Sequence, residues 1–359
     1  MHSRLHLCRL RRHCIRLPGT SAKLGCRAPV RGAAQAPLRP VPRGWLHASG
    51  AHAAKQRNHR LTAEEEQELV EGAPTSTLPG LSPECLAADP EAAAITLAEE
   101  GLLRLNGILG TGMAAALHEH VDDMLKQSIQ SVADGSMPYS SLFGEFMCRE
   151  HRYDLLLPLD AVVLRTVRHV IDRVSPLLEH AIGEDCTMCE LEAIVNDPGS
   201  HAQPLHFDTD LASVRVAMLI ALQDVTPSMG PTAFYPCTNT AEWHIIYKTR
   251  GQELEDLLGS FPRVVAEMSA GDAFVYDTRV LHYGGANTSH VPADSGNTQD
   301  PAGGKALAAV ASTGVGTRRT MFGISFQVES GCFRTDNANM RREYRSKYRI
   351  AEACRWTPS

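Results

Sequence analysis

Hydrophobic residues recur at helical spacing in the first half of the chain. Apolar side chains at steps of four predict a helix over residues 111–127, and a second amphipathic pattern predicts another over 159–182. Pro176 lies inside the second pattern and is expected to kink or split that helix. Residues 134–158 show neither helical nor strand periodicity and are expected to be irregular.

The period changes to that of short strands after residue 185. Turn-bounded apolar runs predict strands over 189–196, 214–222, 232–236, 264–268, 273–277 and 319–328. The run 214–222 is almost entirely apolar, which predicts a strand covered on both faces. Residues 242–258 are predicted to be helical. Helices followed by such strands predict a mainly β fold with flanking helices (α+β) and a jelly-roll core.

Charge is distributed unevenly along the 359 residues. Residues 1–60 hold 13 Lys/Arg and no Asp or Glu. An Arg-rich, acid-free segment is typical of a transit peptide and predicts mitochondrial localisation, with plastid or cytoplasmic localisation as alternatives. A disordered basic tail, or an arm that binds nucleic acid, is the alternative interpretation of the same residues.

The remaining residues are acidic, with 22 Lys/Arg against 41 Asp/Glu. This balance argues against a nucleic-acid partner, because phosphate contacts need clustered cations. No apolar run is long enough to predict a membrane span. Residues 61–90 are expected to form an acidic helix and a Pro-rich linker. Residues 91–350 are expected to form one domain, with a helical lead-in over 91–185 and a β core over 186–330.

Candidate metal chemistry begins with His206 and Asp208. Side chains at i and i+2 of an extended backbone point to the same side, so an imidazole and a carboxylate at this spacing can bind one metal ion. A third ligand is needed. Among the histidines of the β region, His282 is favoured, because it follows an apolar strand and a polar turn and precedes two glycines. Two His and one carboxylate form the facial triad of non-haem iron(II) oxygenases.

The residues around these three candidates resemble the phytanoyl-CoA dioxygenase family of iron(II)/2-oxoglutarate oxygenases. The matching segments stand in order over residues 197–327: Asp197-Pro198-Gly199, Gln203-Pro204-Leu205-His206-Phe207-Asp208, Met229-Gly230-Pro231-Thr232, Ala270-Gly271-Asp272, Leu281-His282-Tyr283-Gly284-Gly285 and the strand that Arg319 begins. The helical region from about residue 94 is similar to the family's lead-in, with less specific motifs.

The resemblance implies a double-stranded β-helix (a cupin-like jelly roll) that uses Fe(II), O₂ and 2-oxoglutarate as cosubstrate. Iron is expected on His206, Asp208 and His282, and the far carboxylate of 2-oxoglutarate on Arg319, whose guanidinium suits a buried carboxylate. Gln203, Thr232 and Ser325 are further candidates for hydrogen bonds to the cosubstrate or the ligands.

Two neighbouring residues, Arg318 and Arg319, are candidates to bind the far carboxylate of 2-oxoglutarate. Strand alternation places Arg319 on a small and polar face and Arg318 on an apolar face, which favours Arg319. Arg319 lies 37 positions after His282, farther than the family's spacing. We interpret residues 290–317, rich in Ala, Gly, Ser and Thr, as a flexible insertion, because long surface loops are tolerated at small entropic cost.

The function expected is a dioxygenase that hydroxylates a small organic or acyl substrate and releases succinate and CO₂. Asp208 favours hydroxylation, because related halogenases carry a small residue in place of the carboxylate. Two alternatives remain: a non-catalytic jelly-roll protein that binds metal and 2-oxoglutarate, and a zinc hydrolase that uses the same three ligands and needs no Arg319. The sequence identifies neither the substrate nor the oligomeric state.

Overall fold

A computed structural model of the chain describes residue 68 and residues 71–144, 149–249, 251–289, 316–328, 339–345 and 347–358. The chain divides into two compact units, residues 1–59 and 60–359, and every described residue lies in the second. The predicted transit segment and nearly all of the acidic helix predicted over 61–71 lie outside the described residues, as do residues 290–315 of the predicted insertion. Mitochondrial localisation stays a prediction.

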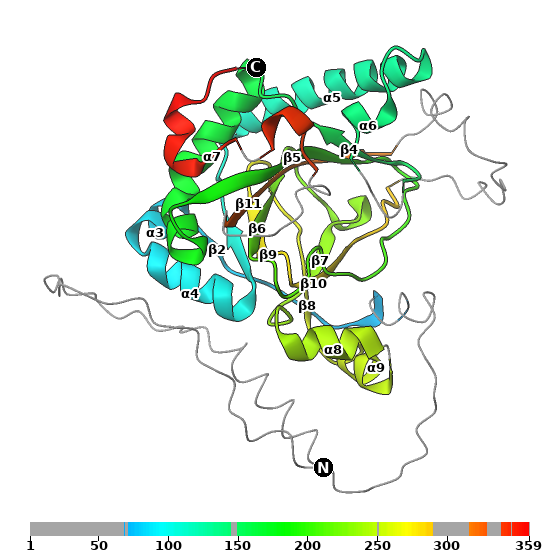
Figure 1. Ribbon diagram of the computed structural model, residues 1–359. Helices are drawn as coiled ribbons and strands as arrows, with labels where there is room; N and C mark the ends of the chain where they lie inside the picture. The colour runs from blue at the N-terminus through cyan, green and yellow to red at the C-terminus, as the bar shows by residue number, and fades with distance from the viewer. Residues whose placement is uncertain are drawn as a thin grey trace, which may run out of the picture. The chain divides into compact units, whose positions relative to one another are not determined.

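Two β-sheets form the centre of the second unit (Figure 1). The seven-stranded sheet has the order β2-β3-β9-β6-β11-β5-β4, and the four-stranded sheet has the order β1-β8-β7-β10. The strands are β1 (Thr75–Ser76), β2 (Gly80–Leu81), β3 (Leu102–Leu105), β4 (Arg152–Leu156), β5 (Cys186–Asn196), β6 (Arg215–Ala221), β7 (Thr232–Tyr235), β8 (Arg263–Val265), β9 (Ala273–Asp277), β10 (Leu281–Gly284) and β11 (Arg319–Val328).

Helices cover the outer face of the seven-stranded sheet. The helices α3, α4, α5 and α7 gather there, and α7 contacts both β5 and β6 (Figure 1). The α-helices are α3 (Pro83–Ala88), α4 (Pro90–Glu100), α5 (Thr111–Ala133), α6 (Tyr139–Leu142), α7 (Ala161–Ile182), α8 (Ala241–Thr249) and α9 (Gln252–Leu258), and short 3-10 helices are η1 (Pro227–Met229), η4 (Arg342–Tyr344) and η5 (Ile350–Arg355). The predicted class, a β fold with flanking helices and a jelly-roll core, is confirmed.

The position of strand β6 between two hydrophobic cores explains why its sequence is almost wholly apolar. Met218 and Ile220 belong to the core that the sheet forms with the helices, whereas Leu219 belongs to the core between the two sheets. Both faces of the strand are therefore buried, as the pattern predicts. The inner core includes Phe234 of β7 and Phe274 of β9, whose stacked rings lie 5.7 Å apart between their centroids.

The linker predicted over 61–90 is wrong in part. Strands β1 and β2 pair with β8 and β3, and α3 lies within the same stretch, so the folded domain begins before residue 91. Pro83 and Pro90 each occupy the first turn of a helix that a capping side chain begins, Ser82 for α3 and Asp89 for α4. Proline is favourable at that position, because its missing N–H has no partner within a helix anyway.

Three other predictions need correction. The helix predicted to be kinked or split at Pro176 is not split: α7 runs through the proline, with buried apolar residues on both sides. The stretch 134–158, predicted to be irregular, contains α6 and the fully buried strand β4, which pairs with β5 and makes the lead-in part of the sheet. The helix predicted over 242–258 consists of two, α8 and α9.

The two ends of the predicted insertion are held together. Asn287 donates its side-chain amide to the carbonyl of Thr317 at 3.0 Å, and the Ser289 hydroxyl bonds both the carbonyl and the amide of Thr317 at 3.0 Å. The described residues on the two sides of this stretch are therefore adjacent, and β11 begins two residues after Thr317.

No helix in the described ranges is long and apolar enough to cross a membrane.

The start of α7 provides a test of the fold. The Asp160 carboxylate accepts from the backbone amides of Val162 and Val163, each at 3.0 Å, and contacts His120. Asp160→Ala is expected to lower the free energy of unfolding by about 1 kcal/mol, because two helix amides lose their acceptor. Chemical denaturation measures it. Asp172→Ala, on the exposed side of the same helix, is the control and should change stability by less than about 0.5 kcal/mol; equal losses in the two variants would contradict the capping role.

Candidate active site

Two histidines are fixed side by side by an antiparallel backbone bridge. His206 and His282 each donate the backbone amide to the other's carbonyl at 2.9 Å, and their ring centroids lie 4.4 Å apart. His282 lies on β10, and His206 lies on an extended segment that pairs with it. The bridge therefore places both rings on one side of the backbone pair.

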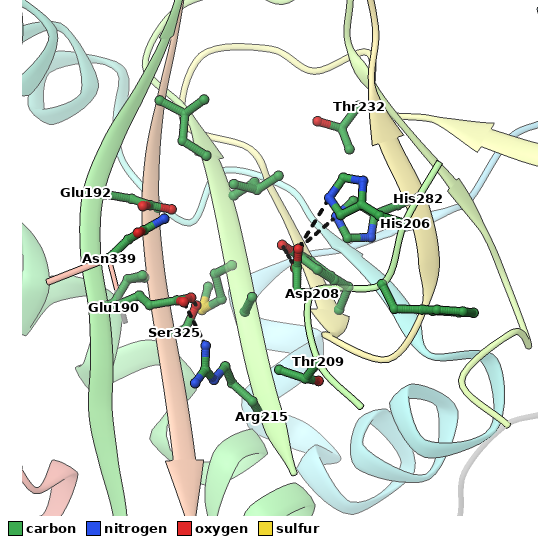
Figure 2. Close-up of a pocket in the computed structure, with 18 of the residues that line it drawn as sticks. Glu190, Glu192, His206, Asp208, Thr209, Arg215, Thr232, His282, Ser325 and Asn339 are labelled. Atoms are coloured by element: carbon green, nitrogen blue, oxygen red, sulfur yellow. Dashed lines mark hydrogen bonds and ion pairs between the residues drawn. The ribbon is translucent and has the colours of Figure 1, made fainter. Parts of the chain in front are cut away.

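Backbone carbonyls orient both rings. His206 Nδ1 lies 2.8 Å from the Pro204 carbonyl, and His282 Nδ1 lies 2.9 Å from the Val280 carbonyl. A carbonyl can only accept, so Nδ1 carries the proton in each ring and Nε2 is the free ligand atom. Both Nε2 atoms point at one carboxylate oxygen, Asp208 Oδ1, at 3.5 Å from His206 and 3.4 Å from His282 (Figure 2).

The other oxygen of Asp208 is held separately. The hydroxyl of Tyr276 on β9 donates to Asp208 Oδ2 at 3.0 Å. Burial raises the pKa of Asp208, but when the rings are protonated the charge of His282 and hydrogen bonds from both imidazoles outweigh it and hold that pKa well below its usual range. A metal ion bound to the two Nε2 atoms would replace those protons and their charge. Burial, followed by the charge of Asp208, raises the pKa of Tyr276 well above its usual value, so the phenol remains a donor. Oδ1 is thereby left to face the two imidazoles.

The three ligand atoms fit a single divalent metal ion. The ligand atoms of His206, Asp208 and His282 all lie within 4.8 Å of one another. Two neutral imidazoles and one carboxylate are the donor set of mononuclear non-haem iron sites, which leaves further coordination positions open. Those positions face a cavity of about 600 Å³ between the sheets.

One end of the cavity is cationic. Arg319 at the start of β11 is 3% exposed and donates to the Gly230 carbonyl. Asn196 is its partner in register on β5. With the amide turned so that its oxygen faces the two arginines, Asn196 accepts from Arg319 Nη2 at 2.8 Å and from Arg152 of β4 at 3.0 Å. Burial and the charge of Arg152 lower the pKa of Arg319 to about 9. Arg319 forms no ion pair with any described carboxylate, and its Nε has no acceptor among the described residues.

A buried guanidinium without a counter-ion is costly, so the arrangement suits an anionic ligand. Arg318, in contrast, forms ion pairs with Asp197 at 2.5 Å and Asp122 at 3.2 Å. The two arginines therefore differ as strand alternation predicts: Arg319 lines the cavity and Arg318 does not.

The three residues predicted to donate hydrogen bonds to the cosubstrate or the ligands differ in their positions in the structure. Gln203 and Thr232 line the cavity beside the metal ligands, and the Gln203 side chain accepts from the backbone amide of Gly284 at 3.0 Å. Ser325 also lines the cavity but donates to Glu190. It lies six positions along β11 from Arg319, about 20 Å at strand spacing. A hydrogen bond from Ser325 to the 2-oxoglutarate carboxylate on Arg319 is therefore excluded.

Sequence reasoning missed three residues of this site: Arg152, Asn196 and Tyr276. Tyr276 lies on the strand predicted over 273–277, but its partner Asp208 lies 68 positions away in the sequence. Arg152 lies on β4, which has no recognisable strand pattern. Asn196 ends a predicted strand, and only the cross-strand register places it between the two arginines.

A metal-binding triad between the sheets of a jelly roll, with a buried arginine at the far end of the cavity, is the arrangement of non-haem iron oxygenases that use a dicarboxylate cosubstrate. The family model for phytanoyl-CoA dioxygenase (PhyH) matches residues 98–293, more than half of the chain. The chain belongs to this family of iron(II)- and 2-oxoglutarate-dependent oxygenases.

Solved structures of similar fold include three enzymes. The non-heme alpha ketoglutarate dependent carbocyclase SnoK from nogalamycin biosynthesis is 14% identical, with 78% of this chain and 94% of that chain covered and a TM-score of 0.47. The corresponding epimerase SnoN is 18% identical over 67% and 83%, with a TM-score of 0.43. HygX from Streptomyces hygroscopicus, with nickel and 2-oxoglutarate bound, is 10% identical over 65% and 85%, with a TM-score of 0.42. The family assignment does not rest on these three.

The hydrogen bond from Tyr276 to Asp208 tests the ligand arrangement. Tyr276→Phe is expected to weaken divalent metal binding by about tenfold to a hundredfold, because a hydrogen bond that orients a ligand is lost while the ring packing remains. Titration with Co(II), followed by its visible absorption, measures the affinity. Tyr139→Phe, on α6, is the matched control and should bind Co(II) as the wild type does. Unchanged affinity in Tyr276→Phe would show that Asp208 needs no such support.

Proposed function

We propose that this protein is an iron(II)- and 2-oxoglutarate-dependent dioxygenase that hydroxylates a small molecule. The observation that carries the proposal is the pairing, in one cavity, of the three-ligand cluster with a buried arginine that has no carboxylate partner in the described chain. A zinc hydrolase would use the three ligands but would have no need of Arg319.

In the proposed reaction, 2-oxoglutarate, O₂ and R–H give succinate, CO₂ and R–OH. Bound iron(II) supplies the O₂ activation that is coupled to decarboxylation of 2-oxoglutarate. Arg319 binds the far carboxylate of the cosubstrate, and Arg152 adds a second positive charge through the shared Asn196. Gln203 and Thr232 lie where they can donate hydrogen bonds to the bound cosubstrate.

The third ligand supports hydroxylation over halogenation. Asp208 fills the position that a halide occupies in halogenases, and Tyr276 holds its second oxygen in place. The carboxylate therefore stays a ligand, and hydroxylation is the outcome that this ligand set supports. The remaining wall of the cavity must orient R–H and exclude bulk water.

Succinate formation from 2-oxoglutarate, measured without an added substrate R–H, tests the proposal. The protein with iron(II) and 2-oxoglutarate is expected to form succinate in air and none under argon, because O₂ is consumed in the decarboxylation. His206→Ala should reduce the rate to background, since one metal ligand is lost. His180→Ala, exposed at the end of α7, is the control and should keep the wild-type rate. Absence of succinate from an iron-loaded, folded wild type, or turnover that survives in His206→Ala, would contradict the function.

The two adjacent arginines provide a matched comparison. Arg319→Gln is expected to raise the KM for 2-oxoglutarate by at least about thirtyfold, because truncating one partner of a buried charge pair costs about 2 kcal/mol or more. Arg318→Gln removes ion pairs outside the cavity and should lower stability while leaving KM within about threefold. Steady-state succinate formation measures both. Equal KM values in the two variants would remove Arg319 from the cosubstrate site.

A further inference from the structure

A helix outside both sheets contacts the segment that carries two of the metal ligands. The chain leaves the four-stranded sheet between β7 and β8 to form α8 and α9 (Figure 1). Tyr247 of α8 donates its hydroxyl to the carbonyl of Leu205, the residue before His206. His244, one turn earlier in α8, stacks its ring on Phe207 with 3.7 Å between the centroids, and Tyr247 packs edge-on against Phe207 at 5.2 Å. The helix therefore holds the ligand segment at two positions.

Phe207 is the residue between the two ligands of this segment. A ring that is held in place restricts the backbone on both of its sides, which here carries His206 and Asp208. The segment is held separately by backbone hydrogen bonds: His206 pairs with His282, and the amide of Asp208 donates to the Thr278 carbonyl at 3.0 Å. The ligand segment is thus fixed by β10 with its preceding turn and, independently, by α8.

The same part of the chain also holds the backbone beside the third ligand. Nε2 of His244 donates to the carbonyl of Arg279 at 3.2 Å, in the turn before β10. The hydroxyl of Thr238, in the loop before α8, accepts from the backbone amide of Leu281 at 2.8 Å, one residue before the ligand on β10. Residues 238–247 therefore contact both backbone segments that bring the metal ligands together.

The side chains of α8 that make these contacts lie outside the cavity. Phe207 is among the described residues that line the cavity, whereas His244 and Tyr247 are not. The helix has its own anchor, because Trp243 is 3% exposed and packs edge-on against Phe261 at 5.4 Å between the ring centroids. Any influence of His244 and Tyr247 on the site must therefore act through the residues that they hold.

We propose that α8 positions the metal ligands, with Tyr247 and His244 as the positioning residues that set the metal affinity of the site. Loss of either contact gives the ligand segment more freedom, and a metal that binds must remove this freedom again. Binding is thereby weakened although all three ligands remain. The coupling is reciprocal, so a bound metal stabilises the contacts of α8 by the same factor that those contacts add to metal affinity. The inference concerns the metal ligands and goes beyond the reaction proposed above.

Substitutions on α8 test the effect on the metal. Tyr247→Phe is expected to lower the Co(II) affinity of the full chain about fivefold to tenfold, because it deletes the hydrogen bond to Leu205 and keeps the ring. His244→Leu is expected to lower it about tenfold, because the stacked ring and the hydrogen bond to Arg279 are both lost. Titration followed by Co(II) absorption measures the affinity, and thermal unfolding confirms that each variant is folded.

Tyr344→Phe is the matched control. The hydroxyl of Tyr344 accepts from the backbone amide of Leu159 at 3.0 Å, within the core that the seven-stranded sheet forms with the helices. This variant also loses a hydrogen bond between a tyrosine and the backbone, but away from the ligand segment. It is expected to be less stable than the wild type and to bind Co(II) within about twofold of the wild-type affinity.

Hydrogen exchange measures the coupling in the opposite direction. Saturating Co(II) should slow backbone amide exchange in α8 of the wild type by at least about threefold, because the metal stabilises the contacts that hold the helix. In Tyr247→Phe the slowing should shrink by the same factor as the affinity. Exchange in α5, which does not touch the ligand segment, should be unchanged by Co(II). A helix that only fills space would show no dependence on the metal.

The inference is overturned if either folded variant of α8 binds Co(II) within about twofold of the wild type, if Tyr344→Phe weakens binding as much as Tyr247→Phe, or if Co(II) leaves exchange in wild-type α8 unchanged. Should His244→Leu fail to fold, Tyr247→Phe decides alone.

Succinate formation separates this inference from the proposed function. Tyr247→Phe should need more iron(II) than the wild type to reach half of its maximal rate, and at saturating iron it should keep the KM for 2-oxoglutarate within about twofold, because Arg319 is untouched. A rise in KM equal to the loss of metal affinity would overturn the positioning role. A wild type that forms no succinate contradicts the proposed function, while the Co(II) measurements still decide the role of α8.

Discussion

The backbone bridge between His206 and His282 is the interaction on which the site depends. It joins an extended segment before β6 to β10 of the four-stranded sheet, and its reciprocal hydrogen bonds fix the separation of the two imidazoles. Asp208 lies two positions after His206 in the sequence, so the same bridge also fixes the position of its carboxylate. Backbone carbonyl groups then determine the tautomer of each ring by accepting from Nδ1. The hydroxyl of Tyr276 donates to Oδ2 of Asp208 and leaves Oδ1 available as a ligand atom. Backbone geometry, more than side-chain charge, thereby assembles the ligand set.

Charge changes sign along the wall of the cavity that β4 and β5 form. Arg152 and Arg319 stand at one end with Asn196 between them, and Glu192 lies four positions along β5 from Asn196, beside the buried Asp154 of β4. Arg319 has no carboxylate partner in the described part of the chain, and buried charge is stable only when paired. A dicarboxylate bound at the first end would supply that partner.

Local sequence determined some of these features and long-range register determined the others. The i, i+2 spacing of His206 and Asp208, the turn before His282 and the alternation that separates Arg319 from Arg318 are all properties of short segments, so the sequence predicts them. Arg152 lies on a strand with no alternating pattern, because both of its faces are buried. Asn196 can be recognised as a site residue only from the cross-strand register that places it beside Arg319 and Arg152. The segment before residue 91 was misjudged because its prolines begin helices here and do not mark a linker.

The central claim is that His206, Asp208 and His282 present one metal to 2-oxoglutarate. The most direct test is the visible absorption of the protein under argon, titrated with iron(II) and then with 2-oxoglutarate. Chelation of the metal by the keto acid should produce a charge-transfer band that requires both additions, is lost in His282→Ala and persists in His180→Ala. A band that survives in His282→Ala, or an iron-loaded wild type that gives none, would contradict the claim.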